Sequence, residues 1–528
     1  MKRLRNLIIL LAVFLILAGT AGSASAERPF QLPMNQALVM EAGESSNPRD
    51  YDPATTHGSG DQLAFSGLVA FDPQLNLIPD LAESWDINSV RTVYVFHLRP
   101  GARFQDGRSV TAQDVIYSWE RAALPLKKSD TVLTYLGDIV GVKEMHAGQS
   151  NSITGLKALD DRTLQVTIDA PKPYFLLKLT AGVALVVDKE NVESGSDWVY
   201  RPNGTGPYKL VEWKHGERIV YQSNADFYLG EPHIPYVIYQ INQGDSQRLY
   251  ESGKIDMTSV YSVDRFLDPS EPMHNELYSG VSLCTGYVVF DVTKPPFDDV
   301  KVRQAFSMTF DRQKYVDVVM NGHALPAIGF YPPGLPGFNP ALEGLPFDPQ
   351  RALQLLAESK YGSASALPPI VYTEAGIGSY INSRTAALAQ MWKQYLGVTI
   401  TVENVEPDFY LDQLYSGHHG QLFNGGWCAD YPDPENFADV LFHTGTQQNT
   451  GNYSNPKLDQ LLEAARTEQD VNKRIQMYQQ AEQMIVDDAP VLFTTNSLSY
   501  MLVKPYVKGF VLTPIQISIE RYMSLAGK

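Results

Sequence analysis

The pattern of secondary-structure signals changes near residue 298, and this change limits the folds open to the chain. Residues 91–98 (RTVYVFHL) are rich in β-branched and aromatic side chains, and residues 156–169 (LKALDDRTLQVTID) have the pattern of strand, Asp-Asp turn and strand. After residue 298, apolar residues recur at helical spacing behind Asp299, a candidate N-cap. We therefore predict a strand-rich first half and an α/β second half.

Capping signals mark helices throughout the second half. An Asp or Asn followed by proline starts a predicted helix at Asp348 and another at Asn455, and the first of these is expected to stop at Gly362. Strand candidates alternate with helices as in a βαβ unit. The predicted strands are residues 367–373 and 397–403, and the predicted helices are residues 384–395 and 471–487.

The N-terminus carries the signals of a secretory signal peptide. Lys2, Arg3 and Arg5 precede an apolar run from Leu7 to Ala18, and small residues ending in an A-x-A pattern predict cleavage after Ala26. The apolar run is shorter than the roughly 20 residues that a membrane-spanning helix needs. A retained signal anchor is the alternative. The mature chain is expected to be exported, periplasmic or in the cell envelope, and soluble.

Charge and length narrow the classes of function. Removing residues 1–26 takes away three basic residues and no acidic ones, which moves the formal net charge from -17 to -20. Nucleic-acid binding relies on Lys and Arg, so this acidic balance argues against it. The 528 residues exceed what one hydrophobic core usually organises, so two or three domains are expected.

The chain has two cysteines, Cys284 and Cys428. Both remain after signal cleavage, and an exported protein meets an oxidising compartment. A disulfide between them is the economical interpretation, and two free buried thiols are the alternative.

Several motifs together resemble the bacterial extracellular solute-binding proteins of family 5, which include the dipeptide and oligopeptide receptors of ABC importers. The resemblance covers nearly the whole mature chain, in the order of the family, and is strongest to the oligopeptide receptors. The motifs are LAESW (81–85), VFHLRPGARFQDGRSVTAQDVIYSW (95–119), GTGPYKLVEW (204–213), SLCTGYVVFDVTKPPFDDVKVRQAFSMTFDR (282–312) and GWCADYPDPENF (426–437).

The resemblance implies an α/β, bilobal periplasmic-binding-protein fold of type II, cluster C, with an extra inserted domain. It divides the mature chain into three domains, which we call domains I, II and III. The predicted bounds are residues 27–65, 187–283 and 499–528 for domain I, residues 66–186 for the inserted, strand-rich domain II, and residues 284–498 for the α/β domain III.

The resemblance also implies a function without catalysis. The chain is expected to bind short peptides in extended conformation between two closing lobes, as a monomer and without a cofactor or metal. It is expected to deliver them to ABC permease subunits that are separate chains in the membrane.

A peptide receptor needs to grip the groups that all peptides share. The resemblance places the ligand beside Gly426, Trp427, Cys428 and Ala429, where its main chain would pair with a strand. Asp430 matches the aspartate that binds the ligand's α-ammonium group, and the alternative is an Asp that caps the following turn.

Three further assignments follow from the same resemblance. His57, Gly58 and Ser59 are placed at the other edge of the ligand, and Tyr287 is placed in the lining of the pocket. Core packing is the alternative for Trp427 and Tyr287, and for Tyr287 it is the more usual role of an aromatic residue near a strand. In the oligopeptide receptors, the cysteines that correspond to Cys284 and Cys428 form a disulfide.

The chain departs from the family where the ligand carboxylate is bound. Positions that carry basic groups in the oligopeptide receptors are Asn424 and Met320 here, with Ser379 near a third. His418 and His419 lie upstream of the motif and are alternatives, although a solvated histidine pair is the plainer interpretation. The preferred peptide length therefore stays open.

Other functions have weaker support. Another solute, such as a sugar, an opine or a metal chelate, is the alternative on the same fold. The histidines are scattered, which argues against direct metal ligation. For a serine acyl-transfer enzyme there is one loose S-x-x-K match at Ser454, without the other motifs of that class.

Overall fold

The computed structural model describes residues 33–41, 51–55, 61–129, 131–241 and 243–528. It consists of an N-terminal unit that ends at Asn35 and a compact unit of residues 36–528. All elements named below belong to the second unit. The predicted signal peptide, residues 1–26, lies outside the described residues and stays a prediction. Among the described helices, none has the length and apolar character needed to span a bilayer.

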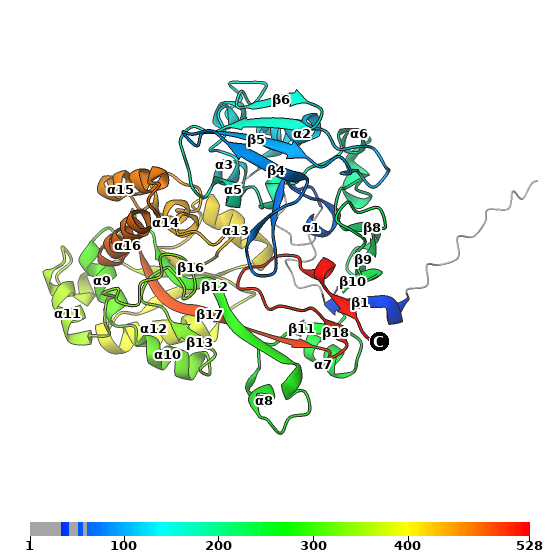
Figure 1. Ribbon diagram of the computed structural model, residues 1–528. Helices are drawn as coiled ribbons and strands as arrows, with labels where there is room; N and C mark the ends of the chain where they lie inside the picture. Colours follow the sequence, from blue (N-terminus) through cyan, green and yellow to red (C-terminus); the bar gives the residue numbers. More distant parts are fainter. Residues whose placement is uncertain (1–32, 42–50, 56–60, 130, 242) are drawn as a thin grey trace, which may run out of the picture. The chain divides into compact units, whose positions relative to one another are not determined.

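An eleven-stranded mixed sheet runs through the second unit (Figure 1). The strand order is β15-β14-β16-β12-β17-β11-β1-β10-β9-β8, and β13 pairs with β17. Parallel pairs join β1 to β10 and β11, and β14 to β15 and β16. The strands are β1 (Ala37–Glu41), β8 (Tyr208–Lys214), β9 (Arg218–Ser223), β10 (Tyr236–Gln240), β11 (Met257–Ser259), β12 (Leu277–Phe290), β13 (Ala324–Pro326), β14 (Ile370–Ala375), β15 (Ile400–Val405), β16 (Leu422–Cys428) and β17 (Val491–Val503).

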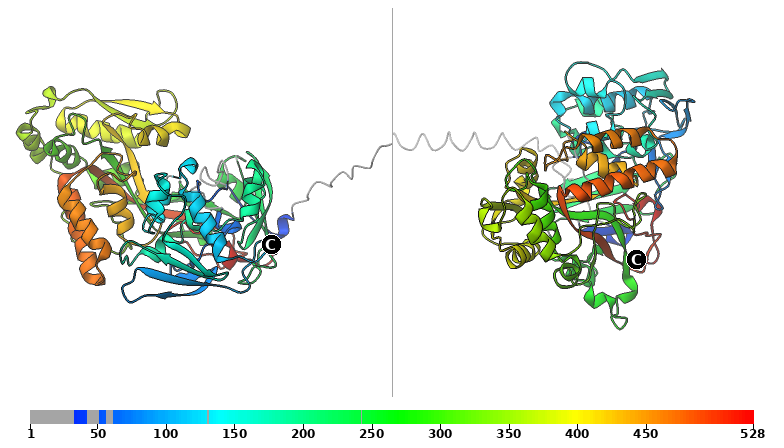
Figure 2. Two further views of the ribbon diagram at one scale, coloured as in Figure 1. Left: turned by 90° about the horizontal axis from the view of Figure 1, so that it is seen from above. Right: turned by 90° about the vertical axis from the view of Figure 1, so that its left-hand side faces the viewer.

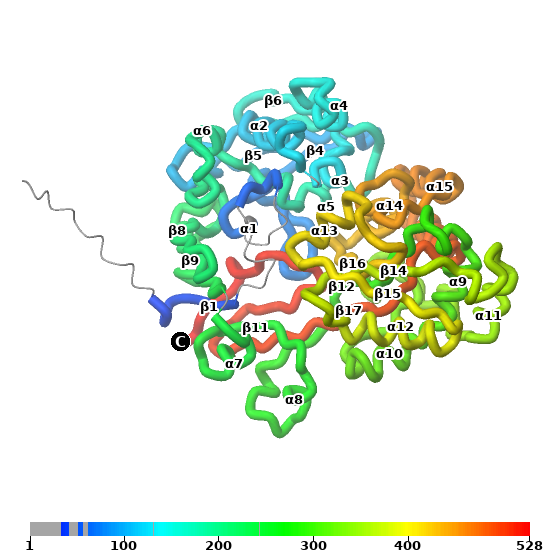
Figure 3. Tube along the Cα trace, turned by 180° about the vertical axis from the view of Figure 1, so that it is seen from behind, coloured from blue at the N-terminus to red at the C-terminus, as the bar shows by residue number. Residues whose placement is uncertain are grey.

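Strands β12 and β17 join the two ends of this sheet (Figure 3). Residues 501–503 of β17 pair with β11, whereas residues 284–290 of β12 pair with β16. Between these regions the register of β12 on β17 shifts twice, between Val281 and Thr285 and between Gly286 and Tyr287. Such irregularities bend strands. The bend lies at the start of the segment that pairs with β16.

A separate four-stranded antiparallel sheet, in the order β4-β5-β7-β6, forms from residues 82–167. It confirms the predicted strand at residues 91–98 and the predicted hairpin at residues 156–169. The sheet packs on the apolar face of α2, where Trp119 is completely buried. Its strands are β4 (Ala82–Ile87), β5 (Val93–Leu98), β6 (Leu156–Asp160) and β7 (Thr163–Thr167); two-stranded sheets are formed by β2 (Val69–Phe71) with β3 (Leu77–Pro79) and by β18 (Val507–Lys508) with β19 (Ser524–Leu525).

Helices of the first half are short apart from α2, as expected for a strand-rich region. The helices up to residue 267 are α1 (Asp61–Ala64), α2 (Ala112–Ala123), α3 (Val132–Tyr135), α4 (Val142–His146), α5 (Phe175–Lys178), α6 (Lys189–Glu193), α7 (Ser246–Glu251) and α8 (Asp264–Leu267).

Helices of the second half are longer, and their predicted caps are confirmed. The side chains of Asp299, Asp348 and Asn455 each accept a hydrogen bond from a backbone N–H in the first turn. Helices α14 to α16, drawn in gold to orange, lie beside the helices that cover the four-stranded sheet, which are drawn in cyan (Figure 1 and Figure 2). The helices are α9 (Val300–Met308), α10 (Arg312–Val319), α11 (Pro349–Glu358), α12 (Ser383–Leu396), α13 (Pro407–Tyr415), α14 (Glu435–Phe442), α15 (Pro456–Thr467) and α16 (Val471–Asp488).

One predicted helix end is wrong. Helix α11 ends at Glu358, and Gly362 lies in the turn that follows, with a φ of +71°. Ser359 leaves the helical conformation, and its hydroxyl donates to the carbonyl of Leu356 at 2.6 Å. This local side-chain hydrogen bond competes with the next helical turn.

The predicted βαβ unit of the second half is confirmed. Strands β14 and β15 are parallel and flank α12, each starting about three residues later than predicted. Trp392 of α12 is completely buried against this sheet, and its indole N–H donates to the carbonyl of Phe306. The mixed sheet with its separate four-stranded sheet has the α/β character predicted for the bilobal fold. The bounds of the three domains stay a prediction.

Candidate functional site

Strand β16 is paired along one edge, and among the described residues its other edge is paired along only part of its length. It lies antiparallel to β12, with Gly426 opposite Gly286 and Cys428 opposite Cys284. The N–H of Ala429 donates to the carbonyl of Leu283 at 2.8 Å. Because alternate residues of a strand bond to the same neighbour, residues 429, 427 and 425 direct their main-chain groups toward β12. The main-chain groups of Gly426 and Cys428 therefore point toward the opposite edge.

That opposite edge meets β14 only at its start, among the residues that the structure describes. The pairs are Tyr372 with Leu422 and Thr373 with Phe423. At Asn424 the edge is covered by side chains, because the Tyr410 hydroxyl donates to the Asn424 carbonyl at 3.0 Å. The described edge is thus available from Gly426 to Cys428, which suits a short extended ligand.

The two glycines of β16 differ in what surrounds them. A Cβ on Gly425 would lie 2.4 Å from Cε2 of Tyr287, so the Tyr287 ring requires glycine at this position. A Cβ on Gly426 would lie 3.6 Å from the nearest protein atom, the Thr285 carbonyl oxygen, which is ordinary contact. Gly426 is therefore not required by packing within the protein, and its missing side chain leaves room for a ligand backbone.

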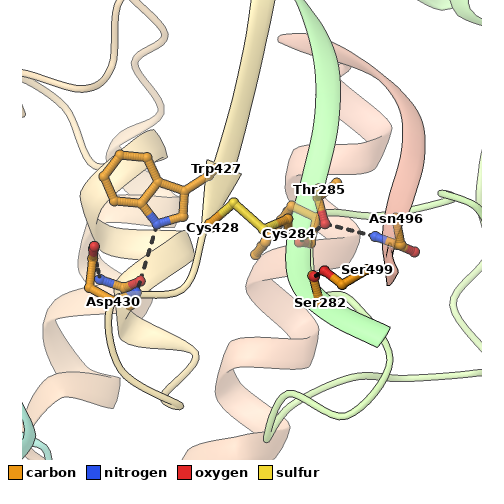
Figure 4. The surroundings of a disulfide bond; sticks show 10 residues. Ser282, Cys284, Thr285, Trp427, Cys428, Asp430, Asn496 and Ser499 are labelled. Atoms are coloured by element: carbon orange, nitrogen blue, oxygen red, sulfur yellow. Dashed lines mark hydrogen bonds between the residues drawn. A yellow bond between two sulfur atoms is a disulfide. The ribbon is translucent and has the colours of Figure 1, made fainter. Parts of the chain in front are cut away.

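Asp430 is exposed and is held by the buried side chain of Asn436. The amide nitrogen of Asn436 donates to Oδ2 of Asp430 at 3.0 Å, and its Oδ1 accepts from the backbone N–H of Asp430 at 3.0 Å. The same Oδ1 accepts from Nε1 of Trp427 at 3.1 Å. Asn436 is completely buried in the first turn of α14. It therefore fixes the positions of Asp430 and Trp427 side by side (Figure 4).

The disulfide between Cys284 and Cys428 is present, as predicted (Figure 4). The two Cα atoms lie 4.0 Å apart. This spacing is typical of the close, non-hydrogen-bonded pairs of an antiparallel ladder, where side chains approach each other most. The bond fastens β16 to β12 beside the open edge.

Other predicted site residues are less exposed. Tyr287 is 9% exposed, and burial together with the nearby Tyr415 raises its pKa. Ala429 is 5% exposed, and its N–H points to β12. Trp427 is half-buried against the core. Their ligand contacts stay predictions. His57, Gly58 and Ser59 lie outside the described residues.

The candidates for the carboxylate end do not form one cluster. Oδ1 of Asn424 accepts from the Tyr372 hydroxyl at 2.6 Å, and Met320 caps the end of α10. Ser379 and His418 are exposed. His419 is half-buried, its ring lies 4.2 Å from that of Phe423, and burial lowers its pKa. His418 is therefore solvated, as the plainer interpretation expected. His419 is not, so the two do not form a solvated pair.

Asn436 is the functional candidate that sequence reasoning missed. Its signal in the sequence was slight: an amide follows the carboxylate by six residues, in a segment for which no helix was predicted. Within the described residues, no group of three or more His, Cys, Asp or Glu side chains is arranged to hold a metal ion.

Comparisons with known proteins identify the relatives of the chain. The model for bacterial extracellular solute-binding proteins of family 5 matches residues 76–449. The periplasmic oligopeptide-binding protein OppA of Salmonella typhimurium is 32% identical to the chain, across 94% of the chain and 93% of OppA.

Solved structures show the same fold. The murein tripeptide binding protein MppA of Escherichia coli is 28% identical, with a TM-score of 0.82 over 93% of this chain and 98% of that one. A structure of MppA in its unliganded open form has a TM-score of 0.72 over 93% of this chain and 97% of that one. OppA of Haemophilus influenzae in complex with the peptide RPPGFSPFR is 27% identical, with a TM-score of 0.80 over 94% of this chain and all of that one.

The family match covers most of the chain, and the fold and the sequence relatives agree with it. The chain belongs to the bacterial extracellular solute-binding proteins of family 5.

Proposed function

We propose that this protein is the solute-binding receptor of an ABC importer and that its solute is a short peptide. The open edge of β16 beside Asp430 is the observation that carries the proposal. Main-chain groups of Gly426 and Cys428 would pair with an extended peptide, and the carboxylate of Asp430 would bind its terminal ammonium group. These are groups that every unmodified peptide has, so affinity does not depend on one side-chain sequence.

The proposed mechanism is capture by closure. A ligand held by β16 would be covered from the other lobe, and His57, Gly58 and Ser59 are the residues that we expect there. Closing around the ligand removes water from its charges and lets both edges of its backbone bond. The closed receptor would then be bound by membrane permease subunits, which are separate chains. The receptor works outside the cytoplasmic membrane after signal cleavage, and no covalent chemistry is part of its cycle.

The chemistry of the site favours a peptide over the other solutes known among its relatives. One relative is a haem-binding protein of Haemophilus influenzae, 26% identical. A haem or a sugar has no extended backbone to pair with a strand edge and no ammonium group for Asp430. A sheet edge next to a fixed carboxylate is matched to a peptide's main chain and N-terminus.

Isothermal titration calorimetry with a tripeptide, its N-acetylated form and a sugar of similar size tests the proposal. The free tripeptide is expected to bind much more tightly than the other two. Mass spectrometry of solutes released from the purified protein gives a second, independent result. A series of peptide masses supports the proposal, whereas one sugar or chelate mass, with no calorimetric signal for peptides, contradicts it.

A further inference from the structure

An ion pair joins the predicted domain II to the predicted domain III. Lys178, at the end of α5, lies in residues 66–186, and Glu435, at the start of α14, lies in residues 284–498. The Lys178 ammonium nitrogen is 2.9 Å from Oε1 of Glu435. Both residues are 4% exposed. A fully buried pair of opposite charges brings these two segments together.

The pair belongs to a larger buried cluster. Lys178 also contacts Asp138 at 3.1 Å, and Asp138 contacts Lys172 at 2.6 Å. On the side of domain III, the hydroxyl of Tyr431 donates to Oε2 of Glu435. The groups that surround Glu435 come from α3, α5, α14, α15, α16 and the residues beside these helices. They are Tyr135, Asp138, Tyr174, Lys178, Tyr431, Asp439, Arg466, Arg474 and Tyr478.

Glu435 shares its cationic partner with another carboxylate. Among the described residues its direct ion pair is with Lys178, which also contacts Asp138. The neighbouring cations are bound to other carboxylates: Lys172 to Asp138 and Asp169, Arg466 to Asp439 and Arg474 to Asp433. An incompletely compensated buried charge is costly, so Glu435 is the carboxyl of this cluster that favours taking up a proton.

The structure superimposes better on a peptide-bound relative than on an open, unliganded one. The TM-score is 0.80 for OppA in complex with a peptide and 0.72 for the unliganded open form of MppA. A contact between domains II and III that is this deeply buried belongs to the closed arrangement, because opening the lobes would separate the two segments.

Glu435 is also directly connected to the ammonium site. The next residue along α14 is Asn436, which holds Asp430 and Trp427. The ion pair between Lys178 and Glu435 therefore fixes the turn of α14 that positions Asp430. Building on the proposed function, we propose that Lys178 and Glu435 are positioning residues, that they meet when the lobes close, and that this contact couples proton uptake to peptide capture.

The direction of the pH dependence follows from burial. Burial in the closed arrangement raises the pKa of Glu435 to about 7, since Lys178 offsets the cost only partly and Asp439 and Asp138 add to it. In an open arrangement we expect the carboxyl to be hydrated, which would return its pKa toward the ordinary value of 4.5. At a pH between these two pKa values, Glu435 holds a proton in the closed state that it lacks in the open state. Closure is favoured at low pH, and the advantage is lost as the pH rises through about 7.

Calorimetry with a tripeptide at pH 6 and pH 8 tests this coupling. Wild-type affinity is expected to be about tenfold tighter at pH 6 than at pH 8, and titrations in buffers of different ionisation enthalpy are expected to show proton uptake near pH 7. Glu435→Gln, which keeps an acceptor for Lys178, is expected to bind with no pH dependence over this range. Lys178→Met leaves buried carboxylates without their partner and is expected to weaken binding about 30- to 100-fold at pH 8.

Lys172→Met is the matched control. Lys172 is similarly buried and shares Asp138 with Lys178, but its described ion pairs stay within domain II. It is expected to lower the melting temperature, as Lys178→Met does, with less than a threefold effect on affinity. Equal affinities of Lys178→Met and Lys172→Met, or the same pH dependence in Glu435→Gln as in wild type, would overturn the proposal.

A ligand-free measurement separates this proposal from the proposed function. Small-angle X-ray scattering at pH 6 and pH 8 reports the balance of open and closed forms. A more compact average at pH 6 in wild type, absent in Glu435→Gln, supports the ion pair even if no peptide binds. Failure of wild type to bind any peptide contradicts the proposed function alone. Scattering profiles that do not change with pH in either protein contradict the role of the Lys178–Glu435 ion pair in closure.

Discussion

Asp430→Asn isolates the charge that we assign to the ligand's ammonium group. Asparagine keeps the shape of the side chain and an oxygen that accepts from Nδ2 of Asn436, so this hydrogen bond survives. The N–H of residue 430 still donates to Oδ1 of Asn436. Folding stability should therefore stay close to wild type while the charge is lost.

The expected loss follows from the strength of a charged hydrogen bond. Such bonds contribute about 1.5–3 kcal/mol, and the value belongs in the upper part of this range because Asn436 holds the carboxylate in place before the ligand arrives. A loss of about 2–3 kcal/mol corresponds to about 30- to 150-fold weaker binding.

A four-way calorimetric comparison tests the pairing directly. Wild type and Asp430→Asn are each titrated with a tripeptide and with its N-acetylated form. If the ammonium group binds Asp430, acetylation weakens binding to wild type by about the same factor as the substitution does. It weakens binding to the variant only a few-fold. Acetylation that weakens binding to both proteins by the same factor would refute the reasoning.

Five other substitutions have defined outcomes. Asn436→Ala removes a buried amide and is expected to lower the free energy of unfolding by about 1–3 kcal/mol and to weaken peptide binding, with chemical denaturation and calorimetry as the measurements. Gly426→Ala is expected to weaken binding about tenfold while stability changes by less than about 1 kcal/mol, whereas Gly425→Ala should cost about 1–3 kcal/mol of stability, and the reverse ranking would count against the site. Cys428→Ser is expected to lower the free energy of unfolding by up to about 5 kcal/mol, since the disulfide closes a loop with a sequence separation of 144; an unchanged urea midpoint would contradict this. Burial raises the pKa of Glu482 to about 8, so wild type should lose stability as the pH rises through that value and Glu482→Gln should not, which thermal melts at pH 6 and pH 9 compare.

The features that sequence predicted well are those decided by neighbours in the chain. The caps at Asp299 and Asn455 depend on a side chain reaching an amide two or three residues away, so the local pattern is sufficient. The hairpin at residues 156–169 depends on a local turn between two apolar strands. The end of α11 was missed because the hydroxyl of Ser359 competes locally with the helix, a preference that the glycine signal outweighed.

The features that sequence did not predict depend on contacts that appear only once the chain has folded. Asn436 is recognisable as a support for Asp430 only after the turn between them has folded back. Lys178 and Glu435 are far apart in the chain, and each alone resembles an ordinary surface charge. The disulfide was predicted because two cysteines in an oxidising compartment leave one intramolecular pairing. The order of the large sheet needed the structure, because strands from both ends of the chain meet in it.

A crystal structure of the protein with a bound tripeptide is the most direct measurement. We predict that the terminal nitrogen of the peptide lies within about 3 Å of a carboxylate oxygen of Asp430 and that its backbone bonds to the main chain of Gly426 and Cys428. A peptide bound elsewhere, with Asp430 facing water and the edge of β16 unoccupied, would contradict the account.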